Sequence, residues 1–163
     1  MPGMTTPGPL MFPSALQAPG TAEGPFETVA TVDELPPGSM KRVTRGDLDI
    51  LIAHTDEGIA AIEDRCPHMA APLSVGTLDG CIVACPLHRG EFDLRDGSTD
   101  VFPTTGGLDA EGNVYEPWSP PGSPPKPPPA DTKALARSLT RVRAIRYLPL
   151  QIVEGSIAIR LPR

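Results

Sequence analysis

The feature that most constrains this chain is a cluster of cysteine and histidine residues between positions 66 and 88. All three cysteines and two of the three histidines lie there, in the order Cys66-x-His68, sixteen further residues, then Cys85-x-x-His88. Thiolate and imidazole together suit zinc or an iron–sulfur centre. Zinc fingers with two cysteines and two histidines take both cysteines from one turn and both histidines from a helix, whereas here each pair mixes the types. We therefore expect two loops that converge on one metal centre.

Alternating apolar and polar residues on both sides of the cluster predict short β-strands. Turn signals such as Gly46-Asp47 and Glu154-Gly155 separate them, as in antiparallel hairpins. The expected strands cover residues 26–32, 40–45, 48–55, 59–63, 81–84, 91–94, 142–153 and 156–162. The pattern predicts an antiparallel all-β domain in which the last two strands form a closing hairpin.

Two segments rich in proline break this pattern, because proline cannot join the interior of a sheet. Residues 1–25 are expected to form a flexible Pro/Gly-rich tail, and residues 26–163 one domain with a long Pro-rich insertion at about 103–141. The insertion contains a proline tract, residues 119–129, and a stretch that could form a short helix, residues 131–142. The insertion would act as a solvated spacer or as a loop that docks a partner. Its proline tract would act as a stiff spacer or as a polyproline ligand.

Composition excludes several classes of protein. The 39% hydrophobic and 21% charged residues are ordinary for a globular domain, and no apolar run reaches the roughly 18 residues of a membrane span. The first residues show no basic leader, so we expect a cytoplasmic protein. Residues 1–120 hold 6 Lys and Arg against 18 Asp and Glu, and residues 121–163 hold 8 against 2. Without a basic face over much of the domain, nucleic acid is not an expected partner.

The cysteine and histidine pairs and their surroundings resemble the Rieske [2Fe-2S] family. The resemblance covers about residues 26–102 and 142–163, and rests on CPH at 66–68, CPLH at 85–88, Gly90, EFDLRDG at 91–97 and YLPLQIVEGSIAIRL at 147–161. It implies an antiparallel sandwich or barrel with a small cluster-binding subdomain. It also implies one [2Fe-2S] cluster, with Cys66 and Cys85 on one iron and His68 and His88 on the other.

Two neutral imidazoles in place of two thiolates make the cluster less negative, which raises its reduction potential to about −150 to +300 mV. Respiratory members of the family add a disulfide and Ser and Tyr hydroxyl donors near the cluster. The matching positions here are Ala71, Leu87, Gly90 and Phe92, which supply no thiol or hydroxyl. The resemblance therefore implies the lower part of the range, as in ferredoxins that feed ring-hydroxylating oxygenases. The chain departs from those ferredoxins at Arg89, where they usually have glycine, and at the insertion, with Pro103 a possible remnant of their proline loop.

The resemblance implies an electron carrier between a reductase and a terminal oxygenase or related enzyme, rather than a stand-alone enzyme. Cys81 is expected to be a buried strand thiol, and His54 a surface residue at the end of a strand. With two histidines on the cluster, only His54 remains, which is too few for a mononuclear non-haem iron site. No dinucleotide-binding fingerprint is present. Two alternatives stay open: a small Rieske subunit of a nitrite reductase or oxygenase complex, and a structural zinc-binding interaction module.

Overall fold

Three small antiparallel sheets make up the part of the chain that this computed structural model describes, residues 7–87, 89–101, 103, 121–122 and 142–162. The first sheet has the order β1 (Phe26–Thr31), β10 (Ser156–Arg160), β9 (Leu150–Val153). The second has the order β2 (Met40–Arg45), β3 (Leu48–Thr55), β4 (Gly58–Glu63). The third has the order β5 (Thr77–Asp79), β6 (Ile82–Ala84), β7 (Glu91–Asp93), β8 (Thr99–Val101). Short 3-10 turns η1 (Ser14–Leu16), η2 (Val32–Glu34) and η3 (Leu73–Val75) join them.

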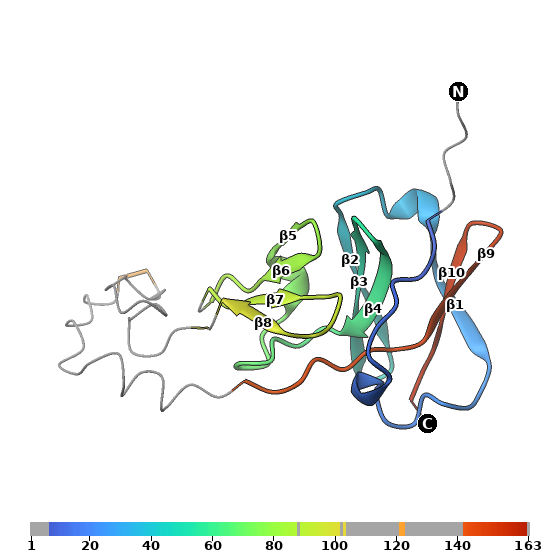
Figure 1. The fold of residues 1–163 in the computed structure, drawn as a ribbon, viewed down its shortest axis with the longest axis horizontal. Coiled ribbons are helices and arrows are strands. Elements are labelled where there is room, and N and C mark those ends of the chain that lie inside the picture. The colour runs from blue at the N-terminus through green and yellow to red at the C-terminus, as the bar shows by residue number, and fades with distance from the viewer. Residues whose placement is uncertain (1–6, 88, 102, 104–120, 123–141, 163) are drawn as a thin grey trace.

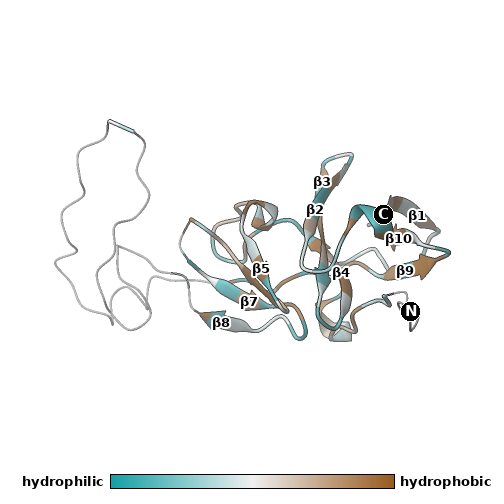
Figure 2. Cartoon of the chain, turned by 90° about the horizontal axis from the view of Figure 1, so that it is seen from above, coloured by the Kyte–Doolittle hydropathy of each residue, from teal (hydrophilic) through white to brown (hydrophobic). Residues whose placement is uncertain are grey.

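The β2–β4 sheet lies between the other two (Figure 1). The β5–β8 sheet, which follows the first cysteine, lies on one side of it, and the β1–β10–β9 sheet lies on the other; Figure 2 shows the same order from above. The expectation of an antiparallel all-β fold is confirmed. The small β5–β8 sheet corresponds to the expected cluster-binding subdomain.

The central strand β3 explains how the three layers hold together. It pairs with β2 on one edge and β4 on the other, and each of its two faces packs into a separate core. Successive side chains of a strand point to opposite faces. Leu51 and Ala53 accordingly join the core that contains Cys66 and Cys85, while Ile50 and Ile52 join the core under the β1–β10–β9 sheet. Burying an isoleucine or leucine contributes about 1.5 to 3 kcal/mol, so this strand stabilises both halves of the molecule.

The terminal hairpin forms as predicted, but its first strand is shorter. The two-residue loop Glu154-Gly155 has φ of 49° and 78°, the backbone that a tight antiparallel turn with the twist of its strands requires. Strand β9 covers only Leu150–Val153, and the described residues before it, 142–149, run as an extended segment. Strands β5 and β8, of three residues each, were not predicted.

The extended segment before β9 ties the central sheet to the β5–β8 sheet through Tyr147. Its side chain is fully buried, and its hydroxyl donates a hydrogen bond of 2.8 Å to the Leu94 carbonyl, at the end of the β7 segment. Ile62 of β4 forms an isolated bridge with the same residue. A single residue near the C-terminus therefore connects the two sheets, with its backbone bridged to the central sheet and its side chain bonded to the end of the β7 segment.

The N-terminal segment packs on the domain, in contrast to the flexible tail that we expected. The Leu10 N–H donates to the Ile59 carbonyl at 2.8 Å, and the Ile59 N–H donates to Gly8 at 2.9 Å. Leu10 is 7% exposed, and the Phe12 ring stacks on Tyr147 with 4.8 Å between centroids. The proline content of this segment hid its few apolar side chains, which bury against β4 and Tyr147 although they form no regular strand.

The expected insertion lies almost wholly outside the described residues, as do most of its proline tract and the predicted helix, except for 103, 121–122 and 142. Within the described ranges, no helix has the length and apolar character needed to cross a membrane.

Candidate metal centre

Cys66 and Cys85 lie at the bases of two loops that leave strands of two different sheets. Cys66 follows β4, and Cys85 follows β6; each is 2% exposed. The first loop folds back on itself, because the Cys66 N–H donates to the Ala71 carbonyl at 2.6 Å. In the second loop, the Cys85 N–H donates to the Gly90 carbonyl at 2.8 Å. The fold therefore brings two thiols that are 19 positions apart in the sequence into one buried region.

The two thiols interact directly. A side-chain hydrogen bond with Cys85, followed by burial, raises the pKa of the Cys66 thiol well above its ordinary value. The backbone N–H groups of His68 and Met69 hydrogen bond to the same side chain and act in the opposite direction. Those amides would stabilise a thiolate, the form in which cysteine binds a metal. A buried pair of thiols with amide donors fits one side of an iron–sulfur cluster, whose sulfurs accept such bonds.

The two histidines of the set differ in what the structure describes. His68 is half-buried and lies two residues after Cys66 in the first loop. His88 lies outside the described residues. In the described part of the chain, no three side chains of His, Cys, Asp or Glu are arranged to hold a metal ion. Of the four predicted ligands, the geometry thus brings together Cys66 and Cys85, with His68 in the same loop as the first.

An ionic anchor that sequence reasoning missed holds the first loop. The buried Asp64 accepts hydrogen bonds from the Ser74 N–H at 2.9 Å and the Ser74 hydroxyl at 2.6 Å. The Arg42 guanidinium of β2 lies 3.4 Å from the same carboxylate. These contacts join the two ends of the loop that carries Cys66 and His68. An aspartate directly after the apolar stretch of β4 was the available signal, since a buried carboxylate needs partners.

Glycine is required where the first loop meets β6. A Cβ on Gly76 would lie 1.8 Å from the Ala84 carbonyl oxygen, a backbone atom next to Cys85. The loop and the strand therefore approach more closely than any other residue allows. This contact sets the separation of the two cysteine loops.

The second loop contains the departure noted at Arg89. This exposed residue has φ of 59°, in the left-handed region where glycine is favoured. The conformation explains why glycine suits the position in similar ferredoxins, since a Cβ there costs about 1 to 2 kcal/mol. Gly90 follows, packed so closely that a Cβ on it would lie 2.9 Å from the Phe92 ring and 3.1 Å from buried Pro103.

The two remaining residues that the sequence singled out, Cys81 and His54, lie outside the two loops. Cys81 is 7% exposed in the turn before β6, as expected for a buried thiol, and no disulfide links any of the three cysteines. The prediction for His54 was wrong, because the residue is 9% exposed and its Nδ1 lies 2.8 Å from the Leu35 carbonyl oxygen. The segment around Leu35 covers the end of β3, which strand periodicity does not reveal.

Comparison with known proteins agrees with this geometry. The family model of the Rieske [2Fe-2S] domain matches residues 26–112, which include both cysteine loops. A 3-phenylpropionate/cinnamic acid dioxygenase ferredoxin subunit of Photorhabdus laumondii is 39% identical over 94 residues, which cover 53% of this chain and 89% of the relative. The chain belongs to the Rieske [2Fe-2S] family. Membership of this family implies one [2Fe-2S] cluster, and the matched residues include Cys66 and Cys85.

Three further proteins resemble this chain in sequence or in fold. A biphenyl dioxygenase ferredoxin subunit of a Pseudomonas species is 38% identical over 79 residues, or 48% of this chain and 72% of the relative. The ferredoxin of carbazole 1,9a-dioxygenase from Nocardioides aromaticivorans shares the fold, with a TM-score of 0.55 at 20% identity over 86% of this chain and all of that one. NdmA of Pseudomonas putida, a longer protein of which 34% is covered, has a TM-score of 0.52 at 25% identity and 83% coverage of this chain.

Proposed function

We propose that this chain is a Rieske-type ferredoxin that passes single electrons between a reductase and a terminal oxygenase or a related oxidoreductase. The observation that carries the proposal is the meeting of Cys66 and Cys85 in one buried site, each at the base of its own loop. The proposed ligand set is Cys66 and Cys85 for one iron and His68 and His88 for the other. The ferredoxin subunits of dioxygenase systems among its relatives support this role.

When bound, the cluster supplies reversible one-electron chemistry. The residues of the chain tune and protect it. Burial of both cysteines at 2% exposure keeps water from the thiolate side, and the N–H groups of His68 and Met69 offset negative charge on Cys66. At the tips of the loops, Met69 is 62% exposed and Leu87 is 39% exposed. Apolar side chains there offer a partner a dry contact close to the histidine side of the cluster.

The proposal extends to potential, compartment and domain organisation. No disulfide can form beside the cluster between positions 71 and 87, which hold Ala71 and Leu87, and no hydroxyl is supplied by Gly90 or Phe92. Both features support a reduction potential in the lower part of the Rieske range. Three cysteines without a disulfide suit the cytoplasm. We propose that residues 26–163 form one domain with an insertion at about 103–141. A fixed small subunit of a larger oxygenase or nitrite reductase complex is the second candidate, and the likeness to a part of the longer dicamba monooxygenase chain supports it.

Iron and acid-labile sulfide assays on the purified full chain, with visible absorption and EPR of the reduced state, test this function. We expect two irons and two sulfides with a Rieske spectrum, and a zinc-containing colourless protein would contradict the proposal. Cys85→Ser should abolish the spectrum, whereas Cys81→Ser, which changes a buried thiol next to the same strand, should retain it. Co-purification with one large partner in fixed ratio would favour the subunit over the free carrier.

A further inference from the structure

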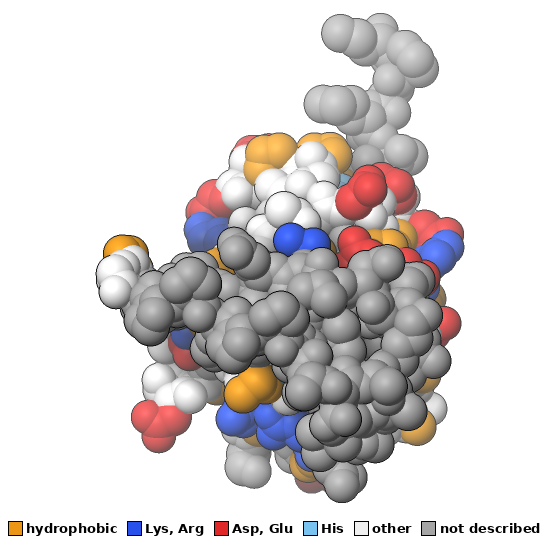
Figure 3. All heavy atoms as spheres, turned by 90° about the vertical axis from the view of Figure 1, so that its left-hand side faces the viewer, with side chains coloured by type: hydrophobic (Ala, Val, Ile, Leu, Met, Phe, Trp, Pro, Cys, Tyr) orange, Lys and Arg blue, Asp and Glu red, His pale blue; other side chains and the backbone are white. Residues whose placement is uncertain are grey.

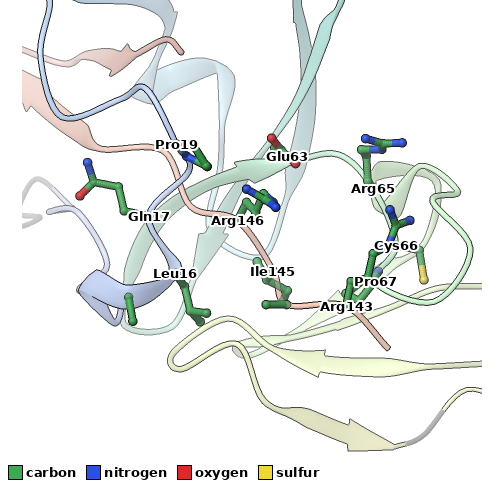
Figure 4. Close-up of a pocket in the computed structure, with 12 residues that line it drawn as sticks. Leu16, Gln17, Pro19, Glu63, Arg65, Cys66, Pro67, Arg143, Ile145 and Arg146 are labelled. Atoms are coloured by element: carbon green, nitrogen blue, oxygen red, sulfur yellow. The ribbon is translucent and has the colours of Figure 1, made fainter. Parts of the chain in front are cut away.

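A groove with a volume of about 610 Å³ opens beside the first cysteine loop. Three segments line it: the N-terminal segment around Leu16, the end of β4 with residues 63–67, and the extended segment 143–146 before β9 (Figure 4). The last two segments are joined where the Arg143 N–H donates to the Pro67 carbonyl at 2.9 Å. Cys66 and Pro67 form one end of the groove, so anything bound there lies next to a cysteine that we assign to the cluster.

The groove is positively charged although the chain as a whole carries a net charge of −6. Arg65, Arg143 and Arg146 line it, and all three are exposed. The single carboxylate in the lining is Glu63, and none of the ion pairs among the described residues involves it or these arginines. Figure 3 views the end of the molecule that carries the β5–β8 sheet, where one group of Lys and Arg side chains lies low in the view and others are scattered above it.

Other described cations are used differently. Lys41, Arg42, Arg45 and Arg95 each form an ion pair with a carboxylate, and Arg160 donates to the Ala22 carbonyl and lies over the Phe26 ring. The charges of Lys41, Arg42, Arg45 and Arg95 are therefore paired within the chain. The groove therefore concentrates three arginines that form no ion pair among the described residues, and their positive charge can attract a negatively charged partner.

The character of the groove favours a protein surface over a small anion. Small-ligand sites usually bury oriented polar groups in a largely apolar cavity, whereas the three guanidinium groups here are exposed. Exposed complementary charges steer protein encounters and set their orientation, and complexes of redox proteins are small and transient. Because the groove lies next to Cys66, a redox partner is the protein whose surface best fits it.

We propose that Arg65, Arg143 and Arg146 form a docking groove for a carboxylate-rich surface of a redox partner. The groove lies beside Cys66, and so provides an electrostatic contact at the cysteine side of the cluster, additional to the exposed loop tips. This proposal rests on the electron-transfer function proposed above.

A fluorescent hexaglutamate peptide is the probe, titrated into the full-length, cluster-containing protein at low ionic strength and followed by anisotropy. We expect binding that weakens as salt is added, because exposed charges are screened. The variant Arg143→Gln/Arg146→Gln should bind about fivefold to tenfold more weakly. The matched control, Lys41→Gln/Arg45→Gln, lowers the net charge by the same two units at cations paired on β2, and should stay within about twofold of the wild type.

Three results would contradict the proposed docking groove: no binding of the peptide to the wild type at low ionic strength, equally weakened peptide binding in both double variants, or undiminished peptide binding by Arg143→Gln/Arg146→Gln. The absorption spectrum of the same samples separates this outcome from failure of the proposed function. Normal cluster content without peptide binding rejects the groove and leaves the electron carrier standing. Peptide binding by a wild-type protein that contains no iron would reject the redox role of the partner together with the proposed function.

Discussion

Replacement of Tyr147 by phenylalanine should loosen the connection between the central sheet and the β5–β8 sheet. Its hydroxyl is completely buried and donates to the Leu94 carbonyl at 2.8 Å, so the change leaves a buried acceptor without that donor. Such a loss costs about 1 to 3 kcal/mol. At about 2 kcal/mol, Tm would fall by about 4 to 8 °C for a chain of this size. The stacked ring of Phe12 keeps its contact, because phenylalanine retains the aromatic face.

The effect should also depend on pH. Burial, and after it the charges of Asp96 and Asp93, raise the pKa of Tyr147 above its ordinary value, against a smaller effect of the Gly97 N–H. Below about pH 10, the ordinary value, the tyrosine is neutral in both folded and unfolded chains, and its full contribution to stability is present. As the pH rises beyond this value, the unfolded chain ionises first and the contribution declines. Tyr147→Phe lacks this titration, so the difference between the two proteins should shrink in alkaline solution.

Urea unfolding of the full chain at pH 7 and at several values between 9 and 11 measures both effects. Ser39→Ala is the control, since it also removes a hydroxyl bond to a backbone carbonyl, that of Pro36, but at an exposed site where water can replace it. We expect Ser39→Ala to change stability by less than about 0.5 kcal/mol. Equal stabilities of wild type and Tyr147→Phe at pH 7, or parallel pH profiles above pH 10, would refute this account of the buried hydroxyl.

Three further variants test the loops. Gly76→Ala should lower the free energy of unfolding by about 3 kcal/mol and reduce the iron content of the purified protein, because the new Cβ would lie 1.8 Å from the Ala84 carbonyl oxygen. The control Gly8→Ala has open space around it and should behave as wild type, so normal iron content in both variants would contradict the close approach. Asp64→Ala should destabilise the protein by about 2 kcal/mol, and Ser74→Ala by about half as much, since the serine variant keeps the hydrogen bond from the backbone N–H of residue 74 to Asp64. Thermal melts that rank the two variants in reverse would exclude Asp64 as the anchor of the loop. Arg89→Gly should be about 1 kcal/mol more stable than Arg89→Ala, because both variants lose the same charge but only glycine lacks the Cβ that is strained at φ of 59°. Identical urea midpoints of the two variants would show that the backbone carries no strain there.

Features that depend on neighbouring positions in the sequence could be predicted. The mixed cysteine and histidine pairs identified the candidate ligands, because metal-binding side chains close in sequence share a loop. Alternation predicted most of the longer strands, and Glu154-Gly155 predicted the terminal turn, since both reflect the conformations of a few adjacent residues. Membership of the Rieske family follows from the same local patterns.

Contacts between distant segments were decided by the packing of the three sheets. The apolar residues of the N-terminal segment had no visible partner until β4 and Tyr147 formed a surface for them. His54 became buried because the segment at Leu35 folds over the end of β3. Arg65 meets Arg143 and Arg146 only because the segment before β9 returns along the first cysteine loop. The sequence by itself determined which residues can bind a cluster and which can form strands, since these are properties of short stretches. Tertiary structure alone decided which charges and apolar side chains from opposite ends of the chain share one surface, because burial of both faces of β3 sets that arrangement.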